Sequence, residues 1–291
     1  MLNHRQPLAL TDRHAARARQ HGQHGAVGGL VLAWLAGALL ATVLLAPASW
    51  LVRPLAQATQ GRLTLVNPQG TIWQGQGGLV FTGGEGSTDR TALPDNLTWR
   101  LKPDWTPEGA GLGLALHMPC CMATPLMLHW QPGWQHQTIR IAAHQSHWPA
   151  ELLTGLGAPW NTLQLQAQLA LNTPGLVIQV QGNRVRGQGS ATLDVLEAAS
   201  RLSTVKPMGN YRLTWQWPTT LPGETLTAND PTLRLQTLAG ALQLSGDGQW
   251  VAGRLRFQGV AEAASGREEA LNNLMNLLGR RQGSRTLIKI G

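Results

Sequence analysis

Two adjacent cysteines, Cys120 and Cys121, are the residues of this chain whose side chains have the clearest chemistry. Neighbouring cysteines cannot join distant parts of a fold. They form a vicinal disulfide ring, pair with another chain, or stay reduced. The structural alternative is two small buried residues at a turn after Pro119. His117 and His129 lie close by in the sequence, but no spacing in this Cys/His set matches a closed zinc site.

No other residues form a catalytic or ligand-binding motif. The sequence has no G-x-S-x-G elbow, no G-x-x-x-x-G-K-[ST] loop and no H-E-x-x-H pair. Its acidic residues are few and dispersed. The glycine clusters at 75–78 and 109–113 lie among predicted strands, whereas a phosphate-binding loop opens a helix. Most tryptophans fall at alternating strand positions, which are typical of a core. We therefore predict no enzyme activity, no catalytic residue, no metal and no cofactor.

The charge balance excludes a second class of function. The chain carries 23 Lys and Arg against 15 Asp and Glu, a formal net charge of +8. The basic residues are nearly all arginines scattered singly along predicted strands, whereas a nucleic-acid-binding surface needs them clustered. We predict no nucleic-acid partner, and a solvated basic surface close to an anionic membrane.

The longest uncharged stretch lies near the N-terminus. From Ala26 to Ala46 the sequence is apolar almost without interruption, and about 20 apolar residues are enough for a helix that crosses a bilayer. Several arginines precede this stretch and only Arg53 closely follows it, so the positive-inside rule places the N-terminus in the cytoplasm. We predict a cytoplasmic tail over 1–24, an uncleaved transmembrane anchor over 25–50, and a periplasmic domain beyond it.

Two details of this segment concern its processing and its contacts. A cleaved signal peptide is the rival interpretation, because Ala46-Pro47-Ala48 resembles a processing site. Against it, the apolar run is longer than usual for a signal peptide and a long polar segment precedes it. Small residues also recur on one face of the predicted helix, a spacing that favours packing against another membrane helix. These residues are Gly29, Ala33 and Gly37. Their alternative explanation is the ordinary Gly and Ala content of bacterial spans.

Beyond residue 60 the pattern changes to that of β-strands. Segments of alternating apolar and polar residues recur with Gly or Pro between them. The first of these predicted strands are 62–66, 71–75, 78–82 and 97–101. A helix is expected near 267–278, where Glu268 and Glu269 occupy the first turn and Gly279 follows the last.

The predicted fold is mainly β. A single N-terminal transmembrane helix precedes a long antiparallel β-sheet, or a sandwich of two similar lobes, with the helix near 267–278 at its C-terminal end. The two periplasmic lobes are predicted over residues 51–150 and 151–291.

Two stretches of the sequence resemble each other. In 66–79 and again in 180–193 a glycine, Gly70 or Gly182, stands five residues before a Gly-x-Gly pair, and a Leu-Thr-Trp strand follows later. Glycine within strands marks bends or close backbone approach. We therefore predict a duplicated hairpin in which glycines form the bend. In this duplication Trp73 and Trp99 are expected in places like those of Val185 and Trp215.

The segment GTIWQG at 70–75 resembles the G-T-[LIV]-W-x-G signature of type II secretion system protein N. Three later segments are also similar to blocks of that family and come in the same order. They are a Leu-x-Trp strand followed by proline (97–103), a Ser-Gly-x-Gly-x-Trp hairpin (245–250) and a Leu-Arg-Phe-x-Gly strand (255–259). The residues that carry the resemblance are Gly70, Thr71, Trp73, Gly75, Trp99, Gly246, Gly248 and Trp250. The vicinal cysteines lie outside these motifs.

This resemblance implies a single-pass protein of the bacterial inner membrane with a periplasmic C-terminal domain. It further implies a non-catalytic accessory or assembly subunit of the type II secretion system, which exports folded proteins from the periplasm across the outer membrane. The implied partners are other inner-membrane secretion subunits and the outer-membrane secretin. Exposed edges of a sheet suit such contacts by strand addition.

An AsmA-like protein that handles a lipid or another hydrophobic ligand is the alternative function. The surface of the sheet distinguishes the two interpretations. A lipid carrier needs a continuous exposed apolar stripe, whereas a scaffold needs a closed core with polar edges.

Overall fold

A computed structural model describes residues 33–84, 86–106, 109–134, 136–182, 184–217, 231–251 and 254–291. The chain divides into two compact units, Met1–Ala46 and Pro47–Gly291. In the first unit residues 33–44 form a helix. Within the described ranges, no helix has both the length and the apolar character that a membrane crossing requires. The predicted tail over 1–24 and the part of the predicted anchor before residue 33 lie outside these ranges.

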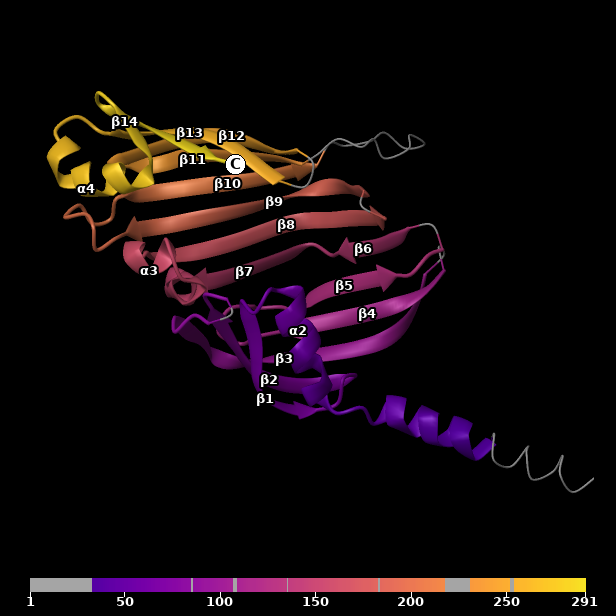
Figure 1. Ribbon diagram of the computed structural model, residues 1–291. Coiled ribbons are helices and arrows are strands. Elements are labelled where there is room, and N and C mark those ends of the chain that lie inside the picture. Colours follow the sequence, from indigo (N-terminus) through magenta and orange to yellow (C-terminus); the bar gives the residue numbers. More distant parts are fainter. Residues whose placement is uncertain are drawn as a thin grey trace, which may run out of the picture. The chain divides into compact units, whose positions relative to one another are not determined.

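The second unit is built on one antiparallel sheet of 15 strands (Figure 1). Its first seven strands are β1 (Leu63–Gly70), β2 (Gln74–Thr82), β3 (Arg90–Thr106), β4 (Gly109–His117), β5 (Leu126–Gln131), β6 (Gln137–Ile141) and β7 (His144–Pro149). The other eight are β8 (Gln166–Gln181), β9 (Arg184–Ala199), β10 (Gly209–Trp217), β11 (Thr232–Gly240), β12 (Leu242–Val251), β13 (Arg254–Ala263), β14 (Arg280–Gln282) and β15 (Arg285–Ile290).

The strands lie side by side in nearly the order of the chain, as the gradual colour change across Figure 1 shows. Two departures occur. The long strand β8 pairs with β6 along one half and with β7 along the other half. At the far edge β15 lies between β13 and β14. Each described strand is therefore held mainly by its neighbours in sequence.

Short helices accompany the sheet and complete three apolar clusters. The helical elements are η1 (Ala48–Leu51), α2 (Val52–Ala58), η2 (Ala150–Leu156), α3 (Trp160–Leu163) and α4 (Glu268–Leu278). The largest cluster joins Leu271, Leu274 and Met275 of α4 to Tyr211 and Leu242 of the sheet. A second cluster includes Leu152 of η2, and a third lies beside α2.

The two faces of the sheet differ in polarity, because side chains directly opposite each other in paired strands point to the same side. One row of opposed residues consists of Leu112, Trp130, Ile139 and Ile178. The row beside it, on the other face, includes Lys102 and Arg140. The apolar row is partly exposed across β4 to β8, away from the three clusters.

The prediction of a long antiparallel sheet is confirmed, and so is the C-terminal helix, which spans Glu268–Leu278. The predicted strand over 71–75 is wrong, because residues 71–73 form the turn between β1 and β2. The division into lobes 51–150 and 151–291 stays a prediction. Hydrogen bonds between β7 and β8 join those two ranges within the one sheet.

Candidate functional site

The motif residues Gly70 to Gly75 close the β1–β2 hairpin. Gly70 and Gly75 are directly opposite each other at the end of the ladder. Gly70 has φ +87°, a left-handed conformation that favours glycine. The Thr71 hydroxyl accepts hydrogen bonds from the backbone N–H groups of Trp73 and Gln74, at 3.2 Å each. The turn thus explains why Gly and Thr occupy these positions.

Trp99 covers this hairpin from β3. It lies directly opposite Gly75 and is 6% exposed. A Cβ on Gly75 would lie 2.5 Å from the Trp99 ring and 2.4 Å from the Gln69 carbonyl oxygen, so a side chain has no room there. The indole N–H of Trp99 donates to the Thr71 carbonyl at 3.1 Å. Trp99 and Gly75 therefore act together as a structural lock.

Trp73 ties the same turn to the next strand. Its side chain is half-buried, and its backbone carbonyl accepts a hydrogen bond from the N–H of Leu101 at 2.6 Å. Three strands, β1, β2 and β3, are thus joined through one six-residue motif. The motif positions backbone and rings, and the Thr71 hydroxyl is used within the turn itself.

A similar arrangement recurs at the β8–β9 hairpin. Gly182 follows the last residue of β8 with φ +57°, and a Cβ on Gly187 would lie 2.5 Å from the ring of Trp217. The expected partner was Trp215, and that prediction is wrong because Trp215 lies opposite Ala191. The tryptophan over the glycine is two residues further along β10.

In the C-terminal motif at 245–250, strand glycines also lie beneath an aromatic ring, which here belongs to a phenylalanine. A Cβ on Gly246 would lie 2.4 Å from the Phe257 ring, and one on Gly248 would lie 3.0 Å from it. Trp250 is half-buried and lies opposite Leu255. An aromatic ring packed across strand glycines is therefore a repeated device of this sheet.

Cys120 and Cys121 form a vicinal disulfide in the connection between β4 and β5. Cys121 is buried and its carbonyl accepts the N–H of His147 in β7, at 2.8 Å. The ring thus sits where a turn meets a strand that is distant in sequence. Its redox state in the cell stays a prediction.

The small residues proposed for helix packing are only partly described. Ala33 and Gly37 lie in the helix over 33–44, and both are exposed. Gly29 lies outside the described ranges. A role of the three in packing stays a prediction.

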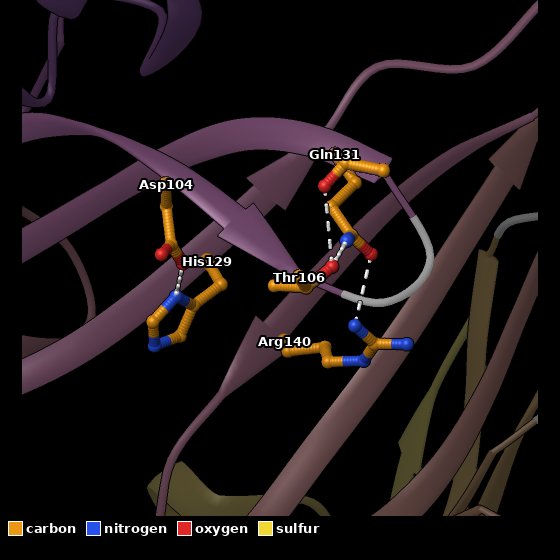
Figure 2. A network of polar contacts seen from close by, with 6 residues as sticks. Asp104, Thr106, His129, Gln131 and Arg140 are labelled. Atoms are coloured by element: carbon orange, nitrogen blue, oxygen red, sulfur yellow. Dashed lines mark hydrogen bonds and ion pairs between the residues drawn. The ribbon is translucent and has the colours of Figure 1, made fainter.

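A network of polar contacts joins β3, β5 and β6 on the polar face (Figure 2). His129 Nδ1 lies 2.6 Å from a carboxylate oxygen of Asp104. Beside this pair, Gln131 donates from its amide to the Thr106 hydroxyl and accepts from Arg140 at 2.9 Å. The residues come from alternating positions of each strand. Sequence reasoning missed the network because strand register, not spacing, brings these residues together.

His144, at the start of β7, is the most buried histidine of the described chain, with 5% of its surface exposed. Neither ring nitrogen has a hydrogen-bond partner among the described residues. Burial lowers the pKa of His144 below its ordinary value. This side chain is therefore neutral in the folded protein near pH 7.

The described residues offer no obvious metal centre. Within the ranges that the structure covers, no group of three or more His, Cys, Asp or Glu side chains is arranged to hold a metal ion. The candidate Cys/His set is divided, since the two thiols are joined to each other and His129 faces Asp104.

Comparison with known proteins identifies the family. The model of the family described as "Type II secretion system (T2SS), protein N" matches residues 61–288. The chain belongs to this family. No curated protein and no solved structure matches it.

Membership of the protein N family indicates a component of the type II secretion system, involved in protein transport and located in the cell envelope. The family is not known for an enzymatic activity. All eight motif residues quoted above lie within the matched range. Their roles in the fold give a structural explanation for these residue types.

Proposed function

We propose that this protein is an inner-membrane-anchored, non-catalytic accessory or assembly subunit of the type II secretion system. It supports the export of folded proteins from the periplasm across the outer membrane. The observation that carries the proposal is the protein N family match over residues 61–288, which spans almost the whole sheet.

The use of the motif residues supports a scaffold. Gly75 and Trp99 lock a hairpin, and Gly246 packs under Phe257. Outside the motif, Gly187 packs under Trp217 in the same way. Residue types that are constrained in this way serve shape rather than chemistry. A sheet whose geometry is fixed at several hairpins presents partners with a rigid surface.

The anchor is proposed from the sequence of Ala26 to Ala46 and from the charge difference across it. It is tested by extracting native membranes with alkaline carbonate and by adding protease to spheroplasts. An anchored chain stays in the pellet and its periplasmic domain is digested from outside. Release into the supernatant would contradict the anchor.

The edges of the sheet are the proposed contact sites for other inner-membrane subunits and for the secretin. At one edge, β14 pairs only with Arg285, Thr286 and Leu287 of β15. The outer side of residues 288–290 therefore has no ladder partner among the described residues. The opposite edge, β1, is less suitable, because its ladder shifts register between Val66 and Gln69 and contains Pro68.

Deletion of the gene in its native host tests the function. We expect folded exoproteins to accumulate in the periplasm and secretion to recover on complementation. Two glycine variants test whether the shape of the sheet is required. Gly75→Val should fail to complement the deletion. Gly113→Ala, whose new Cβ meets only atoms at 3.7 Å or more, should complement it.

Two outcomes would contradict the proposal. Normal secretion together with altered outer-membrane lipid composition or permeability would favour the AsmA-like lipid-handling function instead. Normal secretion together with no co-purification of any secretion subunit would remove the protein from the system altogether.

A further inference from the structure

Strongly exposed tryptophans occur in the second unit of the chain, and two of them share one end of the strands. In the unit from Pro47 to Gly291, three described tryptophans have more than half of their surface in water: Trp50 at 56%, Trp105 at 76%, and Trp134, which is completely exposed. Large aromatic rings normally pack in cores or at interfaces. Their exposure here requires an explanation from outside the fold.

Strand directions show that Trp105 and Trp134 share an end of the sheet. Trp105 is the second-last residue of β3, and Trp134 lies in the connection from β5 to β6. Because β3 and β5 both pair antiparallel with β4, they run in the same direction and finish at the same end. We call this the tryptophan end; it comprises Trp105, Trp130, Trp134 and Val185.

The other two members extend the same apolar surface. Trp130 of β5 lies opposite Leu112, two residues from the partner of Trp105 on β4. Val185, at the start of β9, is 52% exposed. No member of the tryptophan end belongs to the three apolar clusters that the short helices complete.

The start of this unit meets the sheet on the side toward which β1 and β3 run. Pro47 forms a bridge with Thr71 in the β1–β2 turn. Strand β1 runs toward that turn, and it runs parallel to β3 because both pair antiparallel with β2. Pro47 directly follows the apolar stretch Ala26–Ala46 in the sequence. The turn that it meets lies beside Trp99 and Leu101 of β3, four to six residues before Trp105.

The charges near this end fit an anionic surface. Arg100 and Lys102 of β3 are exposed. The nearest acid on β3, Asp104, faces His129 at 2.6 Å. Tryptophan at the headgroup level together with exposed cations is the usual composition of a surface that rests on a bilayer.

We propose that the tryptophan end lies on the periplasmic surface of the membrane, with Trp105 and Trp134 inserted at the level of the lipid headgroups. The proposal rests on the proposed function, because it needs the anchored chain. The partner is a lipid surface rather than a ligand that binds in a groove of the protein. The exposed rings come from separate hairpins, and a groove of about 1220 Å³ in this unit is lined by residues of β10 to β13 and β15 instead.

Depth-dependent quenching of the full chain tests this contact. The chain is reconstituted into vesicles of phosphatidylethanolamine and phosphatidylglycerol that contain nitroxide-labelled lipid. A fluorophore is attached at Trp105→Cys or Trp134→Cys in a Cys120→Ser/Cys121→Ser background. The control is Arg201→Cys, an exposed site between β9 and β10 at the opposite end of the strands. We expect at least twofold stronger quenching at 105 and 134 than at 201.

A second measurement avoids new cysteines. In vesicles of brominated lipid, the Trp105→Phe/Trp134→Phe variant should lose part of the tryptophan quenching that the unmodified chain shows. Equal quenching at the three labelled sites, or an unchanged quenched fraction in the double variant, would overturn the contact. If carbonate extraction shows that the chain is anchored but the fluorophores at 105 and 134 stay unquenched, only this inference fails. If the chain is extracted, the proposed anchor fails first.

Discussion

At the scale of single residues, the most demanding positions of this protein are glycines that lie beneath aromatic rings. A ring over a glycine fills the space that a side chain would occupy, so both residues must be present together. Gly75 beneath Trp99 and Gly246 beneath Phe257 are the two tight cases that also belong to the family motif.

Substitution of Gly75 should therefore destabilise the fold. We expect Gly75→Ala to lower the free energy of unfolding by about 1–3 kcal/mol, the usual range for an overpacked site. Gly113→Ala is the control, because its Cβ would meet Asp104 and His129 at ordinary contact distances of 3.7 Å. Urea unfolding of the detergent-solubilised chain, followed by tryptophan fluorescence, measures both. Equal stability of the two variants would contradict the lock.

A smaller ring should partly relieve the clash. Trp99→Phe alone loses packing and the hydrogen bond to the Thr71 carbonyl, and we expect a cost of about 1–3 kcal/mol. In the double variant Gly75→Ala/Trp99→Phe, the loss should be smaller than the sum of the single losses, because the new methyl group meets a smaller ring. Strict additivity in a double-mutant cycle would argue that the two residues are independent.

His144 should make the stability of the fold depend on pH. Its pKa is lowered by burial in the folded chain, while the unfolded chain keeps the ordinary value. Below that ordinary value the unfolded state binds a proton that the folded state does not, so stability falls with falling pH by at most about 1.4 kcal/mol per pH unit.

We expect His144→Leu to flatten the decline in stability between pH 7 and pH 5. His147→Gln, an exposed site on the same strand, should leave the decline unchanged. Unfolding curves at several pH values provide the measurement. A decline that persists in His144→Leu would show that other groups cause it.

At the scale of elements, α4 stabilises the C-terminal half of the sheet through one face. Leu271, Leu274 and Met275 are buried in one cluster with residues of β10, β12 and β13, whereas Leu277 is 48% exposed. Leu271→Ala should cost about 2–5 kcal/mol, since it leaves a cavity in the largest cluster. Leu277→Ala should cost less than 1 kcal/mol or so by the same measurement. Similar losses for both would mean that α4 contributes little packing.

The elements also show what the sequence can and cannot predict. Alternation and helical spacing are local, so most strands and the helix at 268–278 could be predicted. The turn at 71–73 was mistaken for a strand, because Ile72 and Trp73 continue the alternation while the positive φ of Gly70 is invisible in the sequence. The network of Asp104, His129 and Arg140 depends on register across three strands, which no spacing along the chain encodes.

At the scale of the whole molecule, the family match and the sheet cover nearly the same residues. This agreement explains why weak motifs, taken in order, led to the family. Each short motif marks one hairpin, and the hairpins succeed each other along one sheet. No sequence motif identifies the surface that contacts partners. Whether a strand edge or a tryptophan is exposed depends on how the whole sheet packs.

The sequential order of the strands has a consequence for how the protein is made. From β1 to β6, and again from β8 to β13, each strand pairs with the one synthesised just before it. Loops that close between neighbours cost little entropy and form quickly. In the proposed topology, in which the chain enters the periplasm behind its N-terminal segment, the sheet can therefore form hairpin by hairpin as the chain emerges, before its C-terminal residues have crossed the membrane.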